Sequence, residues 1–120
     1  MSGHPNIITL RLNYTAAQTN VAVVTVSAGS KIVVTQLQVT VDNACTVACQ
    51  VRVGFGATTT PTTTGVLLSH PGIPPGGGVS RGDGSGMLGV GLDDEDLRVT
   101  GTVPTSGSVD IVVSYYTIES

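Results

Sequence analysis

Two neighbouring stretches of the sequence alternate between apolar and polar residues with a period of two. In VVTQLQVTV (33–41) most odd positions are apolar while Gln36, Gln38 and Thr40 are polar, and CTVACQVRVGF (45–55) has apolar residues at its odd positions. Because successive side chains of a β-strand point to opposite faces, each stretch is predicted to be a strand with one buried face. Turn-like residues separate the two, so the sequence predicts a β-hairpin with its turn near residues 42–44.

Strand patterns continue along the rest of the chain. Further strands are predicted at 7–14, 21–26, near 66–68, weakly near 87–92, and at 97–103 and 109–118. Turn residues separate these segments, no helical periodicity is present, and Val, Thr and Gly supply 19, 17 and 16 residues. The sequence therefore predicts an all-β protein, a single jelly-roll-like β-sandwich of about eight strands that forms one domain over residues 1–120.

Residues 70–86 read HPGIPPGGGVSRGDGSG and lie between predicted strands. Because the stretch lies between strands, the sequence predicts a long Gly/Pro-rich loop inside the domain. The loop has few apolar residues of its own, so it is predicted to become ordered through contact with a neighbouring molecule. The Arg-Gly-Asp tripeptide at 81–83 matches a sequence read by integrins, but glycines that permit tight turns explain it more simply. The predicted contact residues of this loop are Ile73, Pro74, Pro75, Val79, Arg81 and Asp83.

The last predicted strand contains two adjacent tyrosines. Tyr115 shares the parity of Val109, Ile111 and Val113, so it is expected in the core, whereas Tyr116 is expected at a surface or a protein contact.

Cys45 and Cys49 fall on one face of one predicted strand, four residues and therefore ~13 Å apart, which exceeds the ~7 Å limit for a disulfide. They are predicted to be reduced and buried. A metal site is not expected, because His4 and His70 are the only histidines.

None of the candidate catalytic patterns has the spacing that its chemistry requires. The acidic run DDED (93–96) lacks the pattern of a calcium loop and is interpreted as a turn, and GDGSG (82–86) is not the nucleophile elbow of a hydrolase. The glycine runs lack the helix and the lysine of a phosphate-binding loop. The sequence therefore predicts no enzyme, no catalytic residue and no cofactor.

Charged residues form 11% of the chain, with five basic and eight acidic side chains. The chain therefore has no basic face that could bind nucleic acid. Because surface charge keeps proteins apart in solution, such a low charge predicts that much of the surface contacts other protein. The N-terminus has no signal-peptide pattern and no run approaches the ~20 apolar residues of a membrane helix, so synthesis in the host cytoplasm without membrane insertion is expected.

The segment EDLRVTGTVPTSGSVDIVVSYYTIE (95–119) resembles the ending of many small tailed-bacteriophage virion proteins. The earlier segments KIVVTQLQVTV (31–41) and VACQVRVGFG (47–56) are similar to the preceding part of the same proteins. The resemblance implies a virion β-sandwich, most like a head decoration (cement) protein, which forms a homotrimer on the major capsid protein at the capsid surface. It carries over no catalytic residue. The alternative is a receptor- or carbohydrate-binding module of a phage fibre or tail, although four aromatic residues leave few to bind a sugar.

Overall fold

The computed structural model describes residues 7–56, 66–82, 87–92 and 94–119, and every regular element in these ranges is a β-strand. The strands are β1 (Ile8–Tyr14), β2 (Gln18–Val24), β3 (Ser30–Val41), β4 (Cys49–Phe55), β5 (Val66–Ile73), β6 (Gly78–Arg81), β7 (Gly89–Val90), β8 (Leu97–Gly101) and β9 (Val109–Glu119). The all-β prediction is confirmed. Within these ranges no helix has the length and apolar character needed to cross a membrane.

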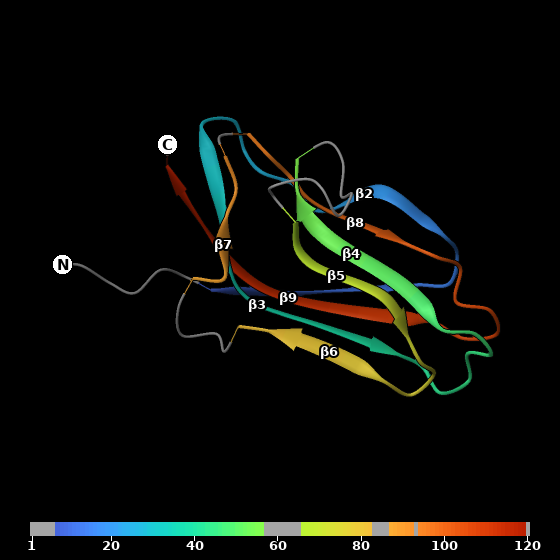
Figure 1. Ribbon diagram of the computed structural model, residues 1–120. Coiled ribbons are helices and arrows are strands. Elements are labelled where there is room, and N and C mark those ends of the chain that lie inside the picture. The colour runs from blue at the N-terminus through green and yellow to red at the C-terminus, as the bar shows by residue number, and fades with distance from the viewer. Residues whose placement is uncertain (1–6, 57–65, 83–86, 93, 120) are drawn as a thin grey trace.

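The strands form two antiparallel sheets packed face to face (Figure 1). Sheet A has the order β1-β9-β3-β6, with β7 also paired to β3, and sheet B has the order β2-β8-β4-β5. Strands β6 and β7 pair with different parts of β3, so together they occupy one strand position. Eight strand positions in two sheets, with the chain crossing repeatedly between them, form the predicted jelly-roll sandwich.

The predicted hairpin is wrong, because β3 and β4 lie in different sheets. Strand β3 pairs with β9 along its whole length, and β4 lies between β8 and β5. The connection at 42–48 crosses between the sheets and bonds to another loop: Asp42 N–H donates to Ser108 O and Thr46 N–H to Thr105 O, each at 3.0 Å. Alternation fixes which face of a strand is buried, but it does not select the partner strand.

The core fills the space between the two sheets with aliphatic side chains. Its fully buried members include Leu37, Val39, Ile111 and Val113 from sheet A and Val51, Val53, Leu97 and Val99 from sheet B. Each such side chain contributes ~1.5–3 kcal/mol when it leaves water, so the alternating strands supply the main stabilisation of the sandwich.

A β-bulge interrupts the pairing of β3 with β9. Val34 pairs with Tyr115 and Gln36 pairs with Ser114, so Thr35 is the extra residue. Its side chain is 3% exposed and its hydroxyl donates to Ser114 O at 3.1 Å. The core-facing side chains of β3 are at even positions before the bulge and at odd positions after it. Figure 1 shows β3 and β9 bending together near β7.

The predicted long loop at 70–86 is also wrong over the part that the structure describes. Its first residues complete β5, and β6 follows after a short turn at 74–77, in which Gly77 N–H donates to Pro74 O at 2.9 Å. Strand β6 then pairs with β3, and Val41 N–H donates to Gly77 O at 2.9 Å. The domain itself therefore orders this stretch through backbone hydrogen bonds, which need few apolar side chains. Residues 83–86 lie outside the described ranges.

Candidate functional site

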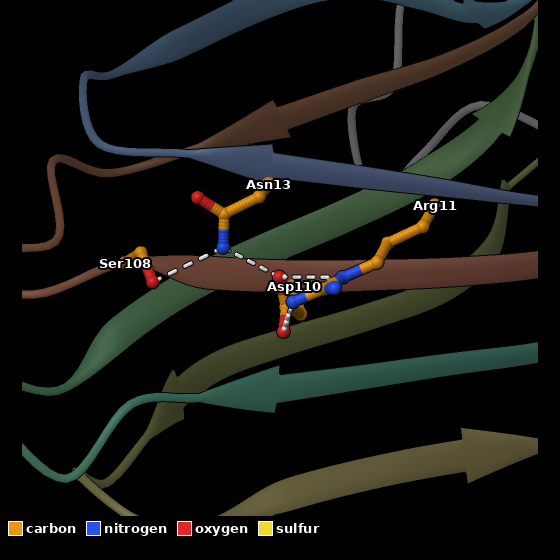
Figure 2. Close-up of polar contacts among 4 residues, drawn as sticks. All are labelled: Arg11, Asn13, Ser108 and Asp110. Carbon is orange, nitrogen blue, oxygen red and sulfur yellow. Dashed lines mark hydrogen bonds and ion pairs between the residues drawn. The ribbon is translucent and has the colours of Figure 1, made fainter.

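A polar cluster lies on the outer face of sheet A, where the end of β1 meets the start of β9 (Figure 2). Arg11 Nη2 donates to Asp110 Oδ2 at 2.8 Å, and Arg11 Nε donates to Asp110 Oδ1 at 3.3 Å. Asn13 Nδ2 donates to Asp110 Oδ1 at 2.5 Å and to Ser108 Oγ at 3.1 Å. Two side chains, Arg11 and Asn13, thus hold the Asp110 carboxylate in place, and Ser108 accepts a second hydrogen bond from Asn13.

This cluster forms one side of an open depression of about 340 Å³. The depression is lined by Arg11, Asn13, Thr40, Val41, Asp42, Ser108 and Asp110. Six of these seven side chains are polar or charged, so the surface suits hydrogen bonding with a polar group rather than burial of an apolar one.

Two charged groups of the depression, Arg11 and Asp110, are paired with each other. Hydrogen bonds from Arg11, and next from Asn13, hold the pKa of Asp110 below its usual value. The hydrogen bond to Asp110 likewise raises the pKa of Arg11, whose side chain is 66% exposed. A carboxylate stabilised in its charged form is a poor general base near neutral pH, so the cluster suits recognition rather than acid–base catalysis.

The acidic run before β8 binds neighbouring turns through its carboxylates. Asp94 Oδ1 accepts from Gly29 N–H at 2.9 Å, Glu95 Oε1 from Leu92 N–H at 2.8 Å, and Asp96 Oδ1 from Val26 N–H at 2.9 Å. The interpretation of this run as a turn agrees with these bonds, while Asp93 lies outside the described ranges. Among the described residues, no three His, Cys, Asp or Glu side chains gather as ligands for a metal ion.

Both cysteines are free and buried, as predicted, with 4% of Cys45 and none of Cys49 exposed. Their predicted place on one strand is wrong for Cys45. Cys45 lies in the connection before β4, where its N–H donates to Asp42 O at 3.1 Å, and β4 begins only at Cys49. Burial raises the pKa of the Cys49 thiol, and the interaction with Cys45 adds to this rise. A turn was predicted at 42–44, but the connection continues to residue 48, so Cys45 precedes the strand to which it was assigned.

The predicted contact residues of the 70–86 stretch are divided by the structure. Ile73 is 1% exposed and belongs to the core, so its prediction as a contact residue is wrong. Pro74 and Pro75 are exposed in the turn, Arg81 is exposed at the end of β6, and Val79 is half-buried against the core. Asp83 lies outside the described ranges.

The two adjacent tyrosines lie on the predicted sides of β9. Tyr115 pairs with Val34 and packs against the core, although it is half-buried rather than fully buried. Tyr116 pairs with Val33 on the outer face and is also half-buried.

An exposed apolar surface around Tyr116 was not anticipated from the sequence. Val33 is 1% exposed but lies outside the core cluster, on the outer face, where it is paired with Val90 on one side and Tyr116 on the other. Ile118 and Leu92 are 42% and 69% exposed farther along the same end of the sheet. The bulge at Thr35 turns Val33 outward, and no local sequence pattern marks that change of phase.

The strand orders define a small jelly-roll sandwich, and its described residues form a polar depression and an exposed apolar surface. No family model and no curated protein matches the sequence. Among solved structures, a chain in the acidic stable capsid structure of Helicobacter pylori bacteriophage KHP30 is similar, with a TM-score of 0.65 and 12% identity over 98% of this chain and 97% of that chain. The two share their fold over nearly their whole lengths.

Two other solved structures resemble the chain less closely. A chain from Bacillus endospore appendages, which form disulfide-linked pili, has a TM-score of 0.47 and 15% identity, with 98% of this chain and 93% of that chain covered. A chain of infectious bursal disease virus, Gx strain, has a TM-score of 0.44 and 13% identity, with 98% of this chain and 33% of that chain covered.

Proposed function

We propose that the chain is a structural protein of a bacteriophage virion that binds the major capsid protein as a decoration protein and stabilises the head. The observation that carries the proposal is the shared fold with a phage-capsid chain at a TM-score of 0.65 across 98% of this chain and 97% of that one. The match covers nearly the whole of both chains, so the two have a similar size and architecture. A non-enzymatic role accords with the pairing of Arg11 and Asp110 in the depression.

The proposal includes a homotrimer located on the outside of the capsid, after synthesis in the host cytoplasm. Its support is the resemblance of residues 31–119 to small phage virion proteins and the low charge of the chain, 11% of residues. The three copies of a trimer would each make the same weak contact with a symmetric capsid. Because the copies are linked, the overall affinity is higher than that of one contact alone.

The deciding experiment combines this chain with particles of the major capsid protein encoded in the same genome. Purified chain is mixed with expanded, undecorated particles, and bound protein is measured by co-sedimentation and located by antibody labelling in electron micrographs. Light scattering of the free chain tests for a mass three times 12.1 kDa. We expect saturable binding over the head. Label on the tail or fibres, or no binding to particles, would refute decoration.

A receptor- or carbohydrate-binding module of a fibre or tail is the second candidate. The polar depression around Asp110 is the observation that favours it, because its hydroxyl, amide and carboxylate groups match those that hydrogen-bond sugars. The same micrographs separate the two functions by the position of the label. Binding of free oligosaccharides that is lost in Asn13→Ala would support the second candidate.

A further inference from the structure

The outer face of sheet B carries positive charge without a carboxylate on any of its strands. Strands β2, β4, β5 and β8 contain Arg52 and Arg98 and no Asp or Glu. The strands of sheet A carry both signs, and each sheet has an ion pair: Arg11 with Asp110 on sheet A, and Arg98 of β8 with Asp96, which directly precedes that strand, at 3.3 Å. The chain as a whole has a formal net charge of −3, so the positive charge on this face is a local feature.

Arg52 and Arg98 lie on adjacent strands and on the same face. Their flanking residues Val51, Val53, Leu97 and Val99 all point into the core, so both arginines point outward. Arg52 pairs with Thr100 of β8, while Arg98 pairs with Gly54 of β4. The two arginines are therefore diagonal neighbours, at a spacing of roughly 7–8 Å between such positions, which two long side chains span easily.

The hydrogen-bonding capacity of these guanidinium groups is not filled. Arg98 Nη1 donates to Asn20 O at 2.9 Å, and Arg98 Nη2 is 3.3 Å from Asp96 Oδ2. The Nε atoms of both Arg52 and Arg98 are shielded from water and have no hydrogen-bond partner. Buried polar groups in folded proteins are nearly always bonded, so two unpartnered guanidinium nitrogens on one face indicate an absent acceptor.

We propose that this face of sheet B, centred on Arg52 and Arg98, docks against an acidic protein surface whose carboxylate groups bind the two guanidinium groups. Planar guanidinium groups match carboxylates with paired hydrogen bonds, and arginine is enriched among the residues that contribute most to protein interfaces. Two positive charges are too few to follow a row of phosphates, so a protein partner fits better than a nucleic acid. Identification of that partner as the capsid rests on the proposed function.

The face can be tested on the whole chain without any capsid. The probe is hexaglutamate peptide with blocked ends, titrated into ¹⁵N-labelled protein while the side-chain Nε–Hε signals of the arginines are followed by NMR. We expect saturable shifts at Arg52 and Arg98 and none at Arg11 or Arg81. Loss of a charge-assisted hydrogen bond predicts that Arg52→Gln weakens peptide binding about tenfold or more.

Arg11→Gln is the matched control, since it removes the same charge from the other sheet, and it should leave peptide affinity within about twofold. Ser69→Glu provides a second variant, because Ser69 is exposed and pairs directly with Arg52. Its carboxylate supplies the acceptor within the chain, so it should abolish peptide binding and raise the unfolding temperature.

Two NMR results would overturn the proposal: Nε–Hε signals that show no saturable shift with the peptide, or signals of all four arginines that shift equally. Two binding results would also overturn it. These are a loss of peptide affinity in Arg11→Gln equal to that in Arg52→Gln, or tighter binding of inorganic phosphate or oligothymidylate than of the peptide. Capsid decoration is decided separately by co-sedimentation. If the Arg52→Gln chain decorates particles as fully as the original chain does, the capsid contact lies on another surface of the protein, while decoration itself is supported.

Discussion

Tyr14 and Gly101 provide a sharp test of core packing, because the structure predicts opposite effects for two small substitutions. The Tyr14 side chain is 4% exposed, and its hydroxyl is buried without a hydrogen-bond partner. A Cβ atom at Gly101 would overlap that hydroxyl oxygen and would lie 3.1 Å from Tyr14 Cζ and 3.2 Å from Gln50 O. The absence of a side chain at Gly101 is therefore what makes room for the tyrosine.

Tyr14→Phe should not destabilise the protein. Removal of a buried hydroxyl that has no partner relieves its desolvation cost, so we expect a gain of about 1 kcal/mol in the free energy of unfolding. Gly101→Ala should cost about 1–3 kcal/mol by overpacking, and less when combined with Tyr14→Phe, since the most strongly overlapped atom is then gone. The expected coupling between the two substitutions is about 1 kcal/mol.

Urea titrations followed by circular dichroism measure these free energies, and 1 kcal/mol corresponds to roughly 3–6 °C in Tm for a domain of this size. Gly72→Ala is the matched control, because a Cβ there meets Ala48 Cβ at an ordinary 3.5 Å. The packing argument fails if Tyr14→Phe loses stability, or if Gly101→Ala costs the same with and without the tyrosine hydroxyl.

Three further predictions concern the cysteines, the ion pair and the last strand. Cys45 and Cys49 should react with a thiol reagent after unfolding and hardly at all before it, because both are buried; rapid labelling of the native chain would contradict their burial. The pKa of Asp110 is lower in the folded chain than its unfolded value of 3.8, so its stabilisation is complete above pH 3.8 and is lost as the pH falls through the folded pKa. Acid titrations should therefore show a smaller loss of stability for Asp110→Asn, and identical curves would exclude this contribution. Tyr115→Ala should destabilise the isolated chain by about 2–4 kcal/mol in urea titrations, and Tyr116→Ala by less, since only the first packs against the core; equal losses would mean that both faces of β9 are equally packed.

The sequence predicted the strands better than it predicted their partners. Alternation depends on side chains two residues apart, so β3, β4 and β9 were located from local patterns and their core faces were assigned correctly for most residues. Strand pairing depends on which distant strand lies alongside, and local patterns do not contain that information. The short connection at 42–48 was therefore interpreted as part of a hairpin, although it crosses between the two sheets. The bulge at Thr35 reversed the phase of β3 without leaving a recognisable pattern.

The surfaces were harder to predict for the same reason. Arg11 and Asp110 meet only because β1 pairs with β9, and the residues are far apart in sequence. Strand β6 was missed because it has a single apolar residue, Val79, among glycine and polar neighbours, and is held by backbone bonds to β3. Ile73 was assigned to a loop because prolines and glycines surround it, yet it fills the core.

The position of β9 determines when this fold can form. Strand β9 lies between β1 and β3 in sheet A. Its Tyr115 pairs with Ile8 of β1, so this pairing connects residues from nearly opposite ends of the sequence. During synthesis, β1 and β3 are therefore available long before the strand that connects them, and their unpaired edges must wait for residues 109–119 to emerge. Assembly of sheet A is consequently a late step that depends on long-range closure, which favours slow folding and leaves the unpaired edges of nascent chains open to wrong pairings.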